Sequence, residues 1–362
     1  MNERVFNFNP GPATLPLPVL EEAQRELLNY KGTGMSILET SHRSKEYEAI
    51  NAETEALLKE ILEIPDNYRV LFLQGGATMQ FDMVPLNFLT EGATADYILT
   101  GSFAEKAYKE AQKVGNVHVA ASTKDENYRR IVRFDEIKLS ENPAYVHITS
   151  NNTIFGTQWK EFPDFGDIPL IADMSSDILS RRIDVKKFAL IYAGAQKNLG
   201  PAGVTVVIIR DDMIARSNKK LPSMLRYDVH AENNSLYNTP PVFAVYMVNL
   251  VLKWVKNQGG LAVIEKINEE KASYLYEVID ESEGFYAGHA EKDSRSLMNV
   301  TFRLPSEELE KKFIAEAAEK GLKGLKGHRS VGGIRASIYN AMPVEGCRRL
   351  AEFMRDFYKR HK

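Results

Sequence analysis

The sequence contains a single cysteine, Cys347, so the chain can form neither an internal disulfide framework nor a cluster of thiolate metal ligands. Its formal net charge is only −3, which gives no reason to expect a nucleic acid or an acidic membrane as a partner. No apolar run is long enough to cross a bilayer, and the N-terminal segment lacks the layout of a secretion signal. These absences predict a cytoplasmic protein without a metal site.

Strands alternate with helices along most of the chain, which predicts an α/β fold whose mainly parallel sheet is covered by helices on both faces. Seven apolar segments are the expected strands: residues 69–73, 97–100, 117–120, 144–149, 169–172, 190–193 and 204–209. The C-terminal part instead shows an α+β pattern, with alternating apolar and polar residues at 298–304. We therefore predict a large domain (17–257), a smaller α+β domain (258–362) and an N-terminal arm (1–16) that packs on the smaller domain.

Ligands of such sheets gather at the carboxyl ends of the strands, so the residues that follow each strand are candidates for the site. A glycine turn at 75–78 follows the first strand and opens a helix, where free backbone N–H groups suit a phosphate. Phe103, Thr153, Asp173 and Lys197 follow later strands in order.

Together these residue types are what a pyridoxal phosphate (PLP) site requires. A desolvated lysine holds the cofactor covalently, and an aspartate keeps the pyridine nitrogen protonated. An aromatic residue stacks on the ring, and the helix N-terminus holds the phosphate. Each residue alone has an ordinary explanation: Asp173 could cap a turn, Phe103 could be a core residue, and Lys197 could be a solvated turn lysine. Their conjunction on successive strand ends favours the cofactor site.

Seven motifs carry a resemblance to a known family: FNPGPATLP, SHRSKEY, LQGGAT, ADMSSD, AGAQKNLGPAG, NTPPVFA and GHRSVGGIRASIYNA. From about residue 6 to its end, the chain resembles the phosphoserine aminotransferases, a class V aminotransferase family with the fold-type I PLP architecture. The resemblance implies PLP-dependent transamination between L-glutamate and 3-phosphohydroxypyruvate, giving O-phospho-L-serine and 2-oxoglutarate in serine biosynthesis. It leaves open whether 4-phosphohydroxy-L-threonine, of vitamin B6 synthesis, is a second substrate.

The resemblance also assigns cofactor contacts residue by residue. It implies that Lys197 binds PLP covalently, that Asp173 contacts the pyridine nitrogen and that Thr153 contacts the ring hydroxyl. Phe103 stands at the stacking position, where many relatives carry tryptophan, and is a smaller platform. The implied phosphate contacts are Gly76, Ala77, Thr78 and Gln196, with Asn238 and Thr239 reaching the phosphate of a neighbouring subunit. The active enzyme is therefore expected to be a homodimer.

Two His-Arg pairs, His42-Arg43 and His328-Arg329, lie in polar loops, and Arg335 follows the second pair. A substrate with a carboxylate at one end and a phosphate at the other needs two cationic sites, and guanidinium groups fit both anions. The resemblance implies that Arg335 binds the α-carboxylate and that Arg43, His328 and Arg329 bind the distal anion. Whether His42 serves the neighbouring subunit's site stays open. Thr78 replaces an arginine of some relatives, which removes one contact to an anionic substrate.

The alternatives explain less of the sequence. A cysteine desulfurase needs a mobile nucleophilic cysteine, whereas Cys347 opens a terminal helix and is expected to be partly buried and inert. An alanine–glyoxylate type aminotransferase has little use for two His-Arg pairs. A sugar- or nucleotide-binding module would leave Lys197 unexplained, and a dinucleotide enzyme would need a G-x-G-x-x-G turn after its first strand.

Overall fold

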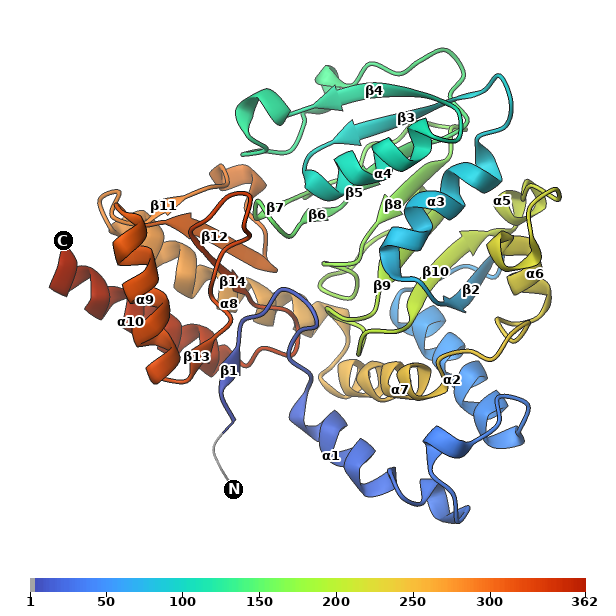
Figure 1. Cartoon of the computed structure of the whole chain (residues 1–362), viewed down its shortest axis with the longest axis horizontal. Coiled ribbons are helices and arrows are strands. Elements are labelled where there is room, and N and C mark those ends of the chain that lie inside the picture. Colours follow the sequence, from blue (N-terminus) through green and yellow to red (C-terminus); the bar gives the residue numbers. More distant parts are fainter. Residues whose placement is uncertain (1–3) are drawn as a thin grey trace.

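The computed structural model describes residues 4–362 and is built around one sheet with the strand order β2-β10-β9-β8-β5-β3-β4 (Figure 1). The strands are β2 (Tyr68–Leu73), β3 (Thr94–Leu99), β4 (Asn116–Ser122), β5 (Val146–Thr149), β8 (Leu170–Asp173), β9 (Leu190–Gly194) and β10 (Thr205–Arg210). Only β10 runs antiparallel to its neighbours, β2 and β9. The predicted seven-stranded, mainly parallel sheet is confirmed.

The strands are apolar along their length because both faces of the sheet are covered. In β10, Val206 and Ile208 belong to one hydrophobic core, whereas Val207 and Ile209 belong to another. Successive side chains of a strand point to opposite faces, so the β-branched run at 204–209 serves both cores. One core includes side chains of α1, α2 and α7, and the other includes side chains of α3 and α4.

The helices that precede the C-terminal part lie around the sheet (Figure 1). They are α1 (Leu17–Glu26), α2 (Lys45–Ile61), α3 (Gly76–Phe88), α4 (Ser102–Gln112), α5 (Asp211–Ala215), α6 (Tyr227–Glu232) and α7 (Val242–Asn257). A short hairpin of β6 (Asn151–Asn152) and β7 (Thr157–Gln158) follows β5. None of the helices within residues 4–362 has the length and apolarity of a membrane-spanning segment.

The C-terminal part has its own core and its own antiparallel sheet, β11-β12-β14. Its elements are α8 (Leu261–Glu281), β11 (Ala287–Gly288), β12 (Asn299–Arg303), α9 (Glu307–Glu319), β13 (Leu322–Lys323), β14 (Ile334–Ser337) and α10 (Val344–His361). The arm joins this part, because β1 (Phe6–Asn7) pairs with β13 and Phe8 enters its core. The first three residues of the predicted arm lie outside the described residues, and the domain limits at 16 and 257 stay predictions.

Cys347 lies deeper than predicted. Its side chain is fully buried in the C-terminal core rather than partly buried, since its helix packs its apolar face inward. Burial raises the pKa of this thiol to about 12. A thiol in this environment is a packing group and not a nucleophile.

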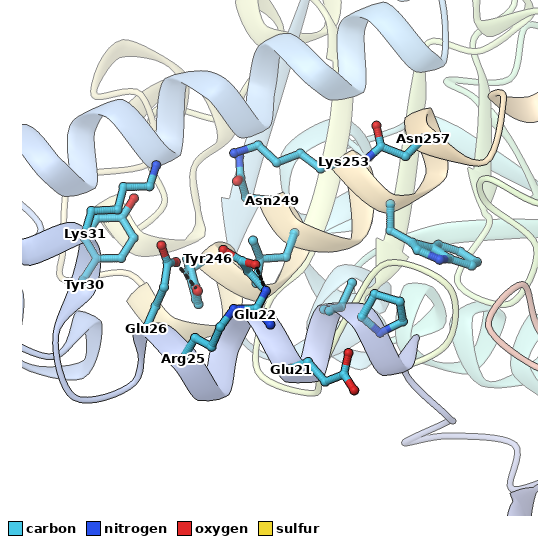
Figure 2. Close-up of a pocket in the computed structure, with 14 residues that line it drawn as sticks. Glu21, Glu22, Arg25, Glu26, Tyr30, Lys31, Tyr246, Asn249, Lys253 and Asn257 are labelled. Carbon is cyan, nitrogen blue, oxygen red and sulfur yellow. Dashed lines mark hydrogen bonds and ion pairs between the residues drawn. The ribbon is translucent and has the colours of Figure 1, made fainter.

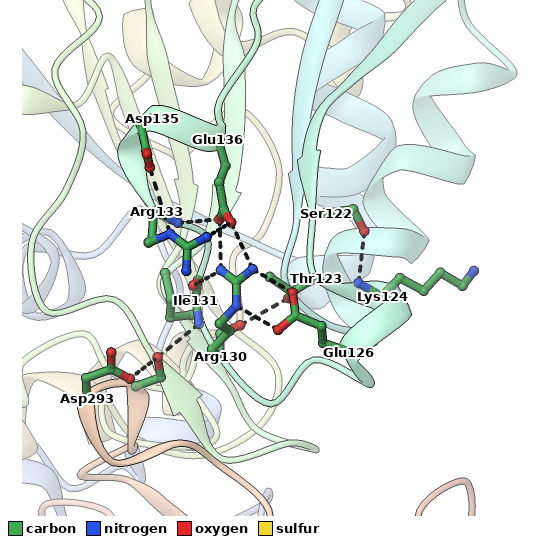
Figure 3. Close-up of polar contacts among 11 residues, drawn as sticks. Ser122, Thr123, Lys124, Glu126, Arg130, Ile131, Arg133, Asp135, Glu136 and Asp293 are labelled. Atoms are coloured by element: carbon green, nitrogen blue, oxygen red, sulfur yellow. Dashed lines mark hydrogen bonds and ion pairs between the residues drawn. The ribbon is translucent and has the colours of Figure 1, made fainter.

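Ion pairs around Arg130 fix the loop that follows β4 and borders the C-terminal part (Figure 3). The Arg130 guanidinium bonds to Glu126 and to Glu136, and its hydrogen bonds to Glu136 hold the pKa of that carboxyl at about 2. The backbone N–H of Ile131 donates to Ser294 Oγ at 3.1 Å. The network therefore ties an edge of the large sheet to the segment that precedes β12.

Candidate active site

Lys197 lies in the turn after β9, and its side chain reaches a cavity at the carboxyl ends of β5, β8 and β9. The cavity has a volume of about 270 Å³. Of the residues predicted for the site, it is lined by Gly76, Ala77, Thr78, Phe103, Thr153, Asp173, Gln196, Lys197, His328 and Arg335. Residues of seven separate segments, spread from α3 to β14, thus meet at one place.

The Lys197 ammonium is held in a partly desolvated position. Its Nζ donates a hydrogen bond to Thr153 Oγ1 at 2.8 Å. Desolvation lowers the pKa of Lys197 to about 8, although the charge of Asp173 acts in the opposite direction. At pH 7 roughly a tenth of this amine is therefore neutral, far more than for an ordinary lysine, and the neutral amine is the nucleophilic form.

Asp173 is the last residue of β8 and is 5% exposed. Its Oδ1 accepts a hydrogen bond from the backbone N–H of Ser175 at 2.9 Å. Burial raises the pKa of this carboxyl, whereas the bonds from Ser175 and the charge of Lys197 lower it. No arginine or lysine of residues 4–362 forms an ion pair with it, so a protonated ring nitrogen in the cavity would supply the missing counter-charge.

The N-terminus of α3 opens into the same cavity. Gly75 and Gly76 have φ angles of +92° and +66°, and a Cβ on Gly75 would lie 2.5 Å from Met79 Cβ. The turn therefore requires glycine, and no side chain of the described residues caps the helix. The first N–H groups of this helix, at Gly76, Ala77 and Thr78, are left to bind an anion such as a phosphate.

Phe103, near the start of α4, forms a side of the cavity. Its ring centroid is 5.4 Å from Lys197 Nζ. Phe103 could therefore offer its aromatic face to a flat heteroaromatic ring bound in the cavity. The donor set of the cavity thus fits PLP in each of its parts: the lysine, the aspartate, the ring platform and the anion site.

The C-terminal part contributes Arg335 and His328 to the lining. Arg335, on β14, is 7% exposed, and its Nε has no hydrogen-bond partner among the described residues. Its Nη1 donates to the Thr153 carbonyl at 3.4 Å. Burial and the charges of Arg335, Arg329 and Lys106 lower the pKa of His328. Both side chains can donate hydrogen bonds to an anion in the cavity.

The remaining predicted residues do not line this cavity. Arg43, Arg329 and Thr239 are exposed, and His42 lies beside Arg43 in the turn before α2. Asn238 donates from Nδ2 to Gln74 Oε1 at 3.2 Å, so it lies next to the residue that precedes the glycine turn. The roles of these residues stay predictions.

The sequence assigns no site role to part of the lining: Pro10, Gly11, Phe81, Thr149, Asn151, Ile154, Ser175 and Ser176. Several follow β5 or β8, so their position after a strand was a usable signal. Pro10 and Gly11 gave no such signal, because they come from the arm. Gly11 has a φ of +144°, and a Cβ there would lie 3.4 Å from Lys197 Cγ.

Two other cavities differ in chemistry from the one at Lys197. One, of about 320 Å³, lies between α1 and α7 (Figure 2) and contains none of the predicted residues. Some of its polar groups bond to one another, as in the bond from Tyr246 Oη to Glu26 at 2.6 Å. Another, of about 460 Å³, adjoins the Lys197 cavity through His328 and Arg335 and forms a cleft toward the surface.

Comparisons with known proteins agree with this geometry. The aminotransferase class-V family model matches residues 5–350. The chain is 63% identical over 358 residues to a phosphoserine aminotransferase of Geobacillus kaustophilus, covering 99% of each chain. It superposes on the phosphoserine aminotransferase structure from Bacillus circulans subsp. alkalophilus with a TM-score of 0.98, 58% identity and full coverage of both chains. A PLP-bound phosphoserine aminotransferase from Trichomonas vaginalis has a TM-score of 0.93 and 39% identity, covering 97% of this chain and 100% of that one.

Proposed function

The chain belongs to the aminotransferase class-V family, and on that premise we propose that it transfers the amino group of L-glutamate to 3-phosphohydroxypyruvate with PLP as cofactor. The products are 2-oxoglutarate and O-phospho-L-serine, as in serine biosynthesis. The observation that carries the proposal is the convergence of Lys197, Asp173 and the uncapped α3 N-terminus on one cavity that Arg335 and His328 also enter. A cytoplasmic location stays a prediction, and a second substrate of the phosphohydroxythreonine type stays open.

The residues that would hold PLP are already arranged around the cavity. Lys197 would bind it covalently, Asp173 would pair with its ring nitrogen, and the α3 turn with Gln196 would bind its phosphate. When bound, PLP supplies an electron sink that stabilises negative charge at the substrate's Cα. Asp173 would support this electron sink, because its buried carboxylate favours a positive charge on the ring nitrogen next to it.

Lys197 acts as the acid and base of the reaction. Its Nζ takes the proton from the substrate's Cα and releases it again within the cavity, a role that fits a pKa of about 8. Thr153 Oγ1 accepts a hydrogen bond from this nitrogen and keeps it directed into the cavity.

Two groups of residues would bind the two ends of the substrate: Arg335 at one end, and His328, Arg329 and Arg43 at the other. The Arg335 guanidinium, with its free Nε, suits the α-carboxylate. His328, Arg329 and Arg43 would receive the distal anion, which is a carboxylate in glutamate and a phosphate in the acceptor. One anion site thus serves both half-reactions.

We further propose that the active form is a homodimer. Asn238, Thr239 and His42 do not line the cavity of their own chain, as expected if they serve the cavity of a second copy. The segments that carry them also expose apolar side chains, with Leu38 62% and Tyr237 47% exposed. Sedimentation equilibrium should give twice the chain mass of 40.9 kDa, and a fully active monomer would contradict the proposal.

The proposed function is tested by comparing two acceptors. With glutamate as donor, phosphohydroxypyruvate should be used about 10²-fold more efficiently than unphosphorylated hydroxypyruvate, because charge-assisted bonds to the phosphate are lost. A coupled assay of 2-oxoglutarate release measures both values of kcat/KM. Equal use of the two acceptors would refute the phosphate site. Alanine with glyoxylate serves as the control pair, and a preference for it would favour the alanine–glyoxylate alternative.

A further inference from the structure

Lys271, on α8, is a buried cation that the reaction does not use. Its side chain is fully buried, and no carboxylate of residues 4–362 forms an ion pair with it. Desolvation lowers its pKa to about 8. A buried ammonium is costly, and an apolar side chain of similar volume is often the more stable choice. Core packing alone therefore does not explain why a lysine stands at position 271.

The Lys271 ammonium binds the backbone at the end of β14. Its Nζ donates to the carbonyl oxygens of Ile338 at 2.9 Å and Tyr339 at 2.7 Å. One turn earlier on the same helix face, Asn268 Nδ2 donates to Asn340 Oδ1 at 2.9 Å. We call this arrangement, Asn268 and Lys271 on residues 338–340, the α8 clamp.

The clamped segment joins the two halves of the active site. It directly follows β14, the strand that carries Arg335. At its other end, the backbone N–H of Asn340 donates to Asn198 Oδ1 at 3.0 Å, and Asn198 is the neighbour of Lys197 in the chain. In between, Tyr339 Oη donates to the Pro10 carbonyl of the cavity wall at 2.7 Å.

We propose that the α8 clamp sets the position of Arg335 relative to Lys197, and that Lys271 is a positioning residue for the substrate's α-carboxylate. The inference rests on the proposed function, which gives Arg335 that carboxylate. An ammonium suits the task because its several donors hold two adjacent carbonyls at once. Without it, the Ile338 carbonyl would be buried and unpaired, and the Tyr339 carbonyl would keep only its bond from the Met342 backbone N–H. The segment would then shift to regain a partner. Both substrates carry an α-carboxylate, so both half-reactions depend on the clamp.

The test uses the Lys271→Met holoenzyme. The half-saturating concentrations of glutamate and of phosphohydroxypyruvate should each rise about tenfold, since a displacement of one group by a fraction of an ångström weakens binding without removing the acid–base lysine. The saturated rate should stay within about threefold of wild type, as expected when a uniform binding interaction is lost. The visible absorbance of bound PLP should be unchanged. Lys271→Arg, which keeps donors for both carbonyls, should restore most of the affinity.

Cys347→Ser provides the matched control, because Cys347 lies in the same core beside Lys271 but bonds to no part of the clamp. It should lower the thermal midpoint and leave both half-saturating concentrations at the wild-type value. If Lys271→Met does not fold, Asn268→Ala breaks the same clamp at Asn340 and should give the same rise. The inference is overturned if the folded clamp variant has the same half-saturating concentrations as the wild type. It is also overturned if Cys347→Ser raises these concentrations as much as the clamp variant does. Wild-type protein without glutamate turnover overturns the proposed function and the inference with it.

Discussion

Replacing Lys197 by alanine is expected to abolish transamination while the folded protein still binds PLP. The substitution removes both the covalent attachment and the only lysine amine of the cavity lining. Loss of the acid–base group alone should reduce the turnover rate by about 10⁴-fold or more. The phosphate and ring sites remain, so PLP should stay bound without the visible absorption of a lysine–cofactor bond. Absorption spectra and the coupled assay measure the two effects, and an active Lys197→Ala enzyme would refute the assignment.

Lys160→Ala is the control for this experiment. Desolvation also lowers the pKa of Lys160 to about 8. Its Nζ, however, donates to the Arg295 carbonyl at 2.5 Å and does not reach the cavity. This variant should keep both the visible absorption of the lysine–cofactor bond and the turnover rate. The comparison shows that a lowered pKa alone, as in Lys160, does not make a lysine catalytic.

Asp173→Asn is expected to reduce turnover on the order of 10³-fold, as do losses of other preorganised electrostatic contacts. The amide has nearly the same shape and can still accept the bond from the Ser175 backbone. It lacks the charge that would keep the cofactor's ring nitrogen protonated. Turnover and the affinity for PLP, measured by titration of the cofactor-free protein, should both fall.

Asp177→Asn is the matched control, since Asp177 is also buried and follows the same strand. It accepts hydrogen bonds from Ser150 Oγ and Gln158 Nε2, and it does not line the cavity. Its substitution should lower the thermal midpoint more than the turnover rate. An equal loss of turnover in both variants would contradict a specific role for Asp173.

The fold and the central part of the site could be predicted because their signals are local. The run at 204–209 is β-branched throughout, and such a run is stable only where both faces of the sheet are covered. In a mainly parallel sheet, residues that follow different strands meet at one edge, which is why Phe103, Asp173 and Lys197 could be grouped before their distances were known.

The rest of the site depends on contacts between distant segments. Pro10 and Gly11 reach the cavity because the arm pairs with β13, and a two-residue strand has no periodicity to detect. Lys271 is one of two lysines in the charged helix α8. Its lowered pKa, like those of Lys160 and Lys197, results from tertiary desolvation that no local pattern reveals.

The pairing of the arm with the C-terminal part also affects the order in which a new polypeptide can mature. Pro10 leaves the ribosome early, yet its carbonyl accepts a bond from Tyr339, 329 positions later. The wall around Lys197 also needs Arg335, so the seven-stranded sheet can be synthesised long before the cavity is closed. Capture of a reactive aldehyde such as PLP in this cavity is therefore confined to chains that have been synthesised beyond Tyr339.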